Sequence, residues 1–198
     1  MTIPHEHYPD PHHDTFSKTV FGFWLYLMTD FMMFACLFAA YVVLKEGTFG
    51  GPSIEEIFSL SYMTIQSLFL LAAAFTSGFA SLAVHRMKKG WTIALFLLVF
   101  LFGLVFFWMQ LSELVRLHLS GLTWKNSAFL SAYFSLIATH ALHVFFGLLW
   151  ILVLLAPVPW KGISLDSLKR LTCLRLFWQF LNVVWIFIFA VVYLMGGL

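Results

Sequence analysis

Five long apolar runs, separated by short polar segments, make up most of this chain. A helix rises about 1.5 Å per residue, so about 20 apolar residues are enough to cross a hydrocarbon core of about 30 Å. The pattern therefore predicts an all-α fold, an integral membrane bundle of five transmembrane helices in a single domain, residues 20–198. The predicted spans are residues 20–44, 62–85, 91–117, 127–156 and 171–195.

A polar segment, residues 1–19, precedes the first span. It contains three prolines, several acidic residues and the histidines His5, His7, His12 and His13. Such a composition cannot bury a core, so we expect a flexible, His-rich cytoplasmic tail. A His-x-His and a His-His pair are also able to catch a metal ion, and this alternative stays open beside that of a solvated tail.

Turn-forming residues mark the connections between the spans. After the first span, glycines and Pro52 break the helix, and Ser53 and Glu56 have the spacing of a capping box, which predicts a short interfacial helix. The basic turn 86–90 is so short that the second and third spans should form an antiparallel hairpin. Proline ends the fourth span at Pro157.

Lysine and arginine are distributed unevenly between the two ends of the spans. Seven lie on the side of the N-terminal tail, namely Lys18, Arg86, Lys88, Lys89, Lys161, Lys169 and Arg170. Three lie on the opposite side, namely Lys45, Arg116 and Lys125. The bias predicts a multi-pass protein with a cytoplasmic N-terminus and a periplasmic C-terminus.

The composition agrees with a membrane protein and excludes other classes. Hydrophobic residues make up 62% of the chain and charged residues 10%, with 24 Phe and 8 Trp. The net charge of +2 is too small to suggest a nucleic-acid partner. Cys36 and Cys173 lie within apolar runs, so we interpret them as small core residues. No secretory signal precedes the first span, so that span should serve as the insertion signal.

Polar side chains inside the spans are the candidates for function, because ionisable and amide groups are costly at membrane depth. Depth estimates predict one layer near the middle of the membrane and another in the outer third. The middle layer contains Asp30, His140, His143, Gln179 and Asn182, and the outer one Gln66 and Gln110. We expect these seven to form a polar network or a lipid contact. Farther out, Glu113 should either snorkel to the surface or pair with Arg116.

His140 and His143 form the most conspicuous polar pair. Residues three apart lie about 60° apart around a helix, so both imidazoles should face one neighbour. For the same reason they cannot ligate one haem iron axially from opposite faces. A copper or zinc site would need further Cys or carboxylate ligands near them. The remaining alternatives are hydrogen bonding between helices, contact with a lipid headgroup and a proton relay.

Several motifs carry a resemblance to a known family. They are Phe21–Asp30, the Gly50–Pro52 loop, Phe129–Phe134, Thr139–Val144 with Gly147 and Trp150, and Phe177–Trp185 with Val192–Leu194. In this order, and over nearly the whole chain, they resemble subunit III of haem-copper oxidases. The short five-span form is most similar to subunit III of bo-type ubiquinol oxidases.

The resemblance implies an accessory subunit of a proton-pumping terminal oxidase in a bacterial inner membrane. In that family the haems, copper and oxygen chemistry belong to subunit I, the expected main partner, whereas subunit III carries no redox centre, catalytic residue or metal ligand. It packs on subunit I with bound phospholipid and supports assembly, stability and proton access. Subunit III of a cytochrome c oxidase and a free-standing transporter remain as alternatives, and the electron donor stays open.

The chain differs from the family pattern at four polar positions. The resemblance implies that Gln66 and Gln110 each replace a Glu, that Gln179 replaces a His, and that Asn182 replaces an Asp. Amides form hydrogen bonds but do not exchange protons. These replacements favour a structural polar network over a proton antenna.

Overall fold

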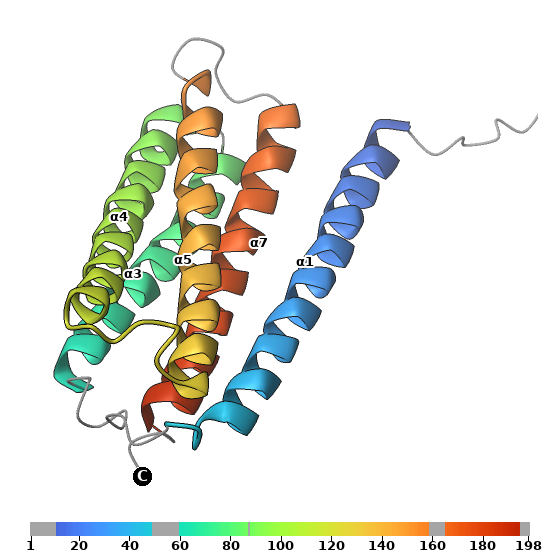
Figure 1. The fold of residues 1–198 in the computed structure, drawn as a ribbon. Helices are drawn as coiled ribbons and strands as arrows, with labels where there is room; N and C mark the ends of the chain where they lie inside the picture. Colours follow the sequence, from blue (N-terminus) through green and yellow to red (C-terminus); the bar gives the residue numbers. More distant parts are fainter. Residues whose placement is uncertain (1–10, 49–59, 87, 159–164, 195–198) are drawn as a thin grey trace, which may run out of the picture.

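Five long helices make up the computed structural model, which describes residues 11–48, 60–86, 88–158 and 165–194 (Figure 1). The helices are α1 (Pro11–Leu44), α3 (Leu60–His85), α4 (Lys89–Leu119), α5 (Ala128–Leu155) and α7 (Leu165–Ile188), which continues as a π-helix, η1 (Phe189–Leu194). Each of the five is long and apolar enough to span a membrane. The described residues include no strand, and the predicted all-α bundle is confirmed.

The helix α1 begins earlier than the apolar pattern predicts. It starts at Pro11 rather than near residue 20, so residues 11–19 extend the helix. Proline is well suited to a first helical turn because its missing N–H would have no partner there. The histidines of the tail lie outside the described side chains, and the capping box at Ser53 lies outside the described residues.

Local signals fix the ends of the inner helices. Ser127 caps α5, since its Oγ accepts a hydrogen bond from the Leu130 N–H at 3.1 Å. The connection between α3 and α4 is short, and these two helices pack closely as the predicted hairpin. The N–H of Phe129 donates to the carbonyl of Gly47 at 3.3 Å and thereby ties the end of α1 to the start of α5.

Four helices form the bundle and the fifth packs on one side of it. In the bundle, α3 contacts α4 and α7, and α5 contacts the same two helices. Helix α1 lies against α5 and α7 and slants away from them toward its N-terminal end (Figure 1). It is held by one narrow stripe, because its fully buried side chains are Leu27, Phe34 and Tyr41, seven residues apart.

The interior of the bundle is packed closely around two large aromatic side chains. A Cβ at Gly103 of α4 would lie 2.5 Å from Cη2 of Trp178, and one at Gly147 of α5 would lie 3.1 Å from Cε1 of Phe177. Both glycines therefore let α4 and α5 approach α7 where the indole and phenyl rings fill the centre.

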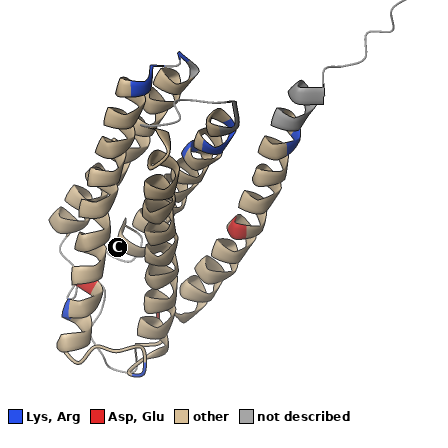
Figure 2. Ribbon diagram, turned by 90° about the horizontal axis from the view of Figure 1, so that it is seen from above, with Lys and Arg blue, Asp and Glu red and all other residues tan. Residues whose placement is uncertain are grey.

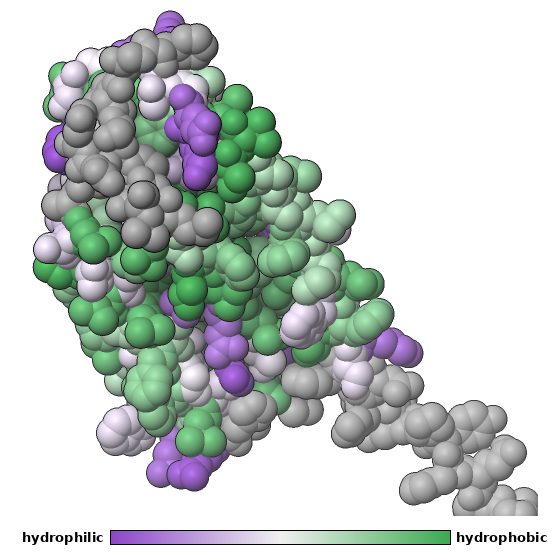
Figure 3. All heavy atoms as spheres, turned by 90° about the horizontal axis from the view of Figure 1, so that it is seen from below, coloured by the Kyte–Doolittle hydropathy of each residue, from purple (hydrophilic) through white to green (hydrophobic). Residues whose placement is uncertain are grey.

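The outer surface is that of a membrane protein. Exposed side chains on the helices include Phe75 at 70% and Trp108 at 71% of their full accessible area. Figure 3 shows broad apolar areas on the face in view, with smaller hydrophilic patches at its margins and between the apolar areas. Lys and Arg lie mostly near the helix ends (Figure 2). The chain is therefore a multi-pass membrane protein.

Candidate functional site

An acid and a histidine meet between α1 and α5. Oδ2 of Asp30 lies 3.7 Å from Nε2 of His143, and the two side chains are 14% and 15% exposed. Nδ1 of His143 lies 2.8 Å from the carbonyl of Thr139, one turn earlier. Since a carbonyl only accepts, Nδ1 carries a hydrogen, and Nε2 faces the carboxylate. At this distance the two side chains are within ion-pair contact but form no hydrogen bond, and Oδ2 of Asp30 has no hydrogen-bond partner among the described residues.

Aromatic rings pack against the histidine of this pair. The Phe34 ring lies 5.3 Å from the His143 ring, and the Phe177 ring stacks on His143 at 6.5 Å, centroid to centroid. Tyr26, one turn before Asp30 on α1, interacts with the carboxylate. The low polarity of these walls strengthens the attraction within the pair if it is charged.

His140 joins three helices. It is fully buried, and its Nε2 donates to the Leu181 carbonyl of α7 at 3.2 Å. Its Nδ1 then accepts from Nε2 of Gln110 on α4 at 3.5 Å. These two partners fix the neutral tautomer, in which one ring nitrogen donates and the other accepts. Both nitrogens are occupied, so His140 acts as an interhelical hydrogen-bonding residue.

Rings also enclose His140. The centroids of Phe106 and Trp185 lie 5.8 Å and 5.3 Å from that of the imidazole. Nε1 of Trp185 donates to Oγ of Ser67 at 2.9 Å, which links α7 to α3. The hydrogen bonds of His140 and Trp185 therefore connect all four helices of the bundle.

A second polar cluster lies toward the end of the bundle where α4 ends and α5 begins. Glu113 is 3% exposed and interacts with Tyr133 and Arg116. The Tyr133 and Tyr193 hydroxyls lie 3.1 Å apart, which joins α5 to η1. The alternative in which Glu113 snorkels to the surface is wrong, because its side chain is buried. Arg116 acts on the carboxyl electrostatically, but neither carboxyl oxygen has a hydrogen-bond partner among the described residues.

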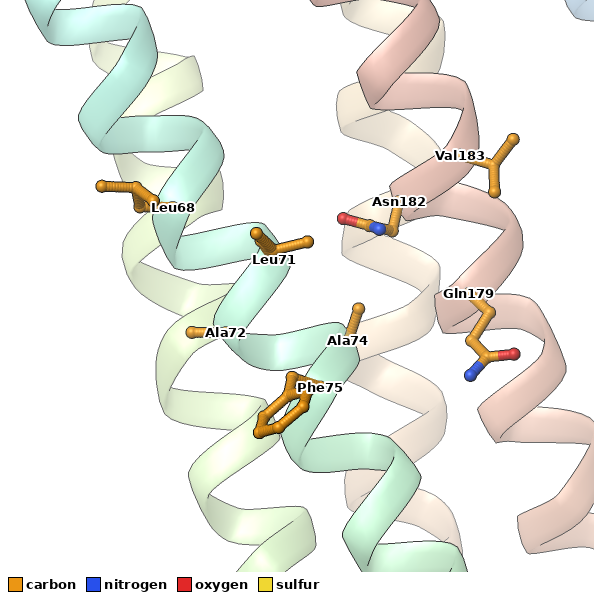
Figure 4. Close-up of a pocket in the computed structure, with 8 residues that line it drawn as sticks. All are labelled: Leu68, Leu71, Ala72, Ala74, Phe75, Gln179, Asn182 and Val183. Atoms are coloured by element: carbon orange, nitrogen blue, oxygen red, sulfur yellow. The ribbon is translucent and has the colours of Figure 1, made fainter.

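Two predicted residues line a groove on the outside of the bundle. Gln179 and Asn182 of α7 face α3 across a hollow of about 660 Å³ (Figure 4). Its other lining residues are Leu68, Leu71, Ala72, Ala74, Phe75 and Val183. Nearer the start of α7, Nη1 of Arg175 donates to Oγ of Ser81 at 3.2 Å.

The structure thus divides the predicted polar residues into separate groups. Asp30 contacts His143, and Gln110 contacts His140, whereas Gln179 and Asn182 lie at the groove. Gln66 is buried, and neither polar atom of its amide has a hydrogen-bond partner among the described residues. Both histidines contact the Phe34 ring of α1 and residues of α7, but their polar partners differ: His143 lies near Asp30 of α1, and His140 contacts Gln110 of α4 and the Leu181 carbonyl of α7. An angle of about 60° is enough to reach different helices in a packed bundle.

The sequence analysis did not predict some of the interacting residues. These are the Tyr133–Tyr193 pair, the Trp185–Ser67 bond and the Arg175–Ser81 bond. The sequence signal that could have indicated them is a hydroxyl or guanidinium group within an apolar run, because such a group needs a hydrogen-bond partner inside a membrane. The described residues contain no group of three or more His, Cys, Asp or Glu side chains that could hold a metal ion.

Comparison with known proteins reveals close relatives along almost the whole chain. It is 46% identical over 196 residues to the cytochrome bo(3) ubiquinol oxidase subunit 3 of Pseudomonas aeruginosa, covering 99% of this chain and 93% of that protein. It is 45% identical over 186 residues to the protein of the same name in Pseudomonas putida, covering 94% and 90%. The cytochrome c oxidase subunit 3 of Bacillus sp. is 38% identical over 175 residues, covering 88% and 84%. No protein-family profile matches the chain.

Proposed function

Because the chain belongs to the subunit III family of haem-copper oxidases, as its sequence motifs predicted, we propose that it is a non-catalytic accessory subunit of a terminal quinol oxidase. In this complex, quinol is oxidised and oxygen is reduced to water at haems and copper held by subunit I. This chain supports assembly and stability and influences the access of lipid and protons.

The hydrogen bonds of His140 are the observation that best supports a structural role for this chain. Both of its ring nitrogens are used between helices, at 3.2 Å to Leu181 and 3.5 Å to Gln110. A side chain so engaged stabilises a particular arrangement of α4, α5 and α7. Interhelical hydrogen bonds in membranes contribute about 0.6 kcal/mol on average and about 1.7 kcal/mol at most.

Four of the seven predicted polar residues act in helix packing rather than as catalytic groups. Asp30 and His143 attach α1 to α5, and Gln110 and His140 hold the centre of the bundle. The amide positions do not exchange protons, so a proton antenna through Gln66, Gln110, Gln179 and Asn182 is disfavoured.

Subunit I is the proposed main partner, with other oxidase subunits and phospholipid covering the remaining apolar surface. The chain lies in a bacterial inner membrane with its N-terminus in the cytoplasm and its C-terminus in the periplasm. Lys18 near the start of α1, the basic α3–α4 turn, and Lys169 and Arg170 near the start of α7 support this orientation.

Purification of the tagged chain from native membranes in a mild detergent tests the proposal. We expect oxidase subunits and a haem absorbance to co-purify, and we expect the chain separated from them to be colourless and less stable. Recovery without any oxidase subunit would overturn the proposal, and so would haem retained by the separated chain. Reduction of the purified complex by ubiquinol but not by reduced cytochrome c would distinguish the quinol oxidase from the cytochrome c oxidase alternative.

A further inference from the structure

The groove between α3 and α7 leaves two amide side chains without partners. Gln179 and Asn182 have no hydrogen bond to another described residue and are partly exposed to the hollow of about 660 Å³. Asn182 points toward α3, and Gln179 lies about one turn away on the same helix (Figure 4). Around them the groove is lined by aliphatic and aromatic groups.

Hydrogen bonds between α3 and α7 lie beyond both ends of the groove. At one end Trp185 donates to Ser67 at 2.9 Å, and at the other Arg175 donates to Ser81 at 3.2 Å. On α3 these serines are about 21 Å apart at about 1.5 Å per residue. The unpaired amides lie between them and therefore within the hydrocarbon layer of about 30 Å, beyond the reach of lipid headgroups.

An acyl chain is an unsuitable cover for this site. Amides buried in hydrocarbon without partners are destabilising, and an acyl chain offers neither donor nor acceptor. The occupant must therefore bring a hydrogen-bonding group to the middle of the membrane. This requirement leaves a polar side chain on a transmembrane helix or the head of a small amphiphile such as a quinol.

The shape of the groove favours a helix. It is open along its length, as a seam between two helices is, and does not enclose a small molecule. Ala72 and Ala74 are small lining residues that allow a backbone to come close. Gln179 and Asn182, three positions apart, present two amides along one line, which a polar residue on a crossing helix is able to meet.

We propose that a transmembrane helix of another oxidase subunit docks in the α3–α7 groove and pairs a polar side chain with Gln179 and Asn182. This inference rests on the proposed function, since it requires that the chain is part of a complex. The surface that recognises the partner is then the groove formed by α3 and α7, and not the exposed faces of α4 and α5.

Photocrosslinking in the whole complex tests this surface. A benzophenone amino acid is placed at Leu71 or Val183, which are 51% and 45% exposed at the groove, and at Leu142 of α5, a control that is 52% exposed. We expect a crosslink to another subunit from the two groove positions, at least tenfold stronger than from the control. Equal crosslinking from Leu142, or adducts only to quinone or lipid, would overturn the docking of a helix.

Substitution of the amides gives a second readout. The double variant Gln179→Leu with Asn182→Leu should lower the amount of partner subunit retained after a detergent wash about tenfold. The control Thr64→Val removes an exposed hydroxyl that bonds only within α3 and should have no effect. Unchanged retention in the double variant would overturn the proposal. If the unaltered chain copurifies with no oxidase subunit, the proposed function itself fails.

Discussion

At the scale of single residues, His140 and His143 have different surroundings although they belong to one short motif. His140 is fully buried and bonded on both nitrogens, whereas His143 contacts an acid on another helix. The sequence predicted that these residues are polar, lie at similar depth and do not share a haem. It did not predict their partners, because those depend on which helices are adjacent and on a rotation of about 60°.

Replacement of His140 should destabilise the chain in proportion to the bonds lost. His140→Leu removes the donor to the Leu181 carbonyl and one of the two acceptors of the Gln110 amide, which keeps the Ile137 carbonyl at 3.5 Å, and this should cost about 1–3 kcal/mol. His140→Gln keeps a donor for the carbonyl and should cost less. Thermal unfolding of the purified complex measures both variants. Equal melting temperatures for the two would show that the hydrogen bonds of His140 contribute little.

Asp30 and His143 should be energetically coupled. Because Oδ2 of Asp30 and Nε2 of His143 lie 3.7 Å apart, the effects of Asp30→Asn and His143→Gln should not add, with a coupling of about 0.5–3 kcal/mol in a double-mutant cycle of unfolding. As a control, Asp30→Asn combined with Thr92→Val should be additive, since Thr92 bonds to its own helix at Lys88. Strict additivity of the Asp30 and His143 variants would mean that no interaction links the pair.

At the scale of helices, the sequence predicted the elements well and their contacts only in part. Apolar runs longer than the membrane is thick have no other stable conformation there, so all five spans follow from hydrophobicity. The α3–α4 pairing followed from a short turn. The sequence did not predict that α1 lies outside the bundle. The buried stripe of this helix, Leu27, Phe34 and Tyr41, has the same apolar composition as the lipid-facing residues. The π-helical turn of η1 likewise has no signal in its apolar sequence.

Gly103 should be required for the close packing of α4 on α7. In Gly103→Ala the new Cβ would lie 2.5 Å from Trp178, whose indole is fully buried and has little room to move, so we expect a loss of about 1–3 kcal/mol in stability. Gly78→Ala in α3 is the matched control, because no atom lies within 4 Å of its Cβ. It should be neutral or stabilise by up to about 1 kcal/mol through helix propensity. Unfolding of both variants in detergent compares them, and a tolerated alanine at Gly103 would contradict the packing.

At the scale of the whole molecule, the chain is a well-packed group of four helices with a loosely attached fifth. In the apolar membrane-spanning segment of each helix, about 17% of the residues are buried in α1, against 44% in α5 and 50% in α3. Near its N-terminal end α1 exposes large apolar groups, including Phe21 and Trp24. A surface of this kind is stable beside lipid or a partner, and the sequence alone does not distinguish these two environments.

The isolated chain should therefore show motion of α1 that disappears in the complex. Spin labels at Phe21 of α1 and Val153 of α5, introduced after replacing Cys36 and Cys173 with Ser, report the distance between these helices by double electron–electron resonance. We expect a broad distribution in the separated chain and a narrow one in the assembled oxidase, because α1 buries a smaller share of its apolar span than the other helices do. Labels at Leu82 and Leu97 across the closely packed α3–α4 hairpin serve as the control and should give a narrow distribution in both samples. An equally narrow α1–α5 distribution in the separated chain would mean that α1 needs no partner to stay in place.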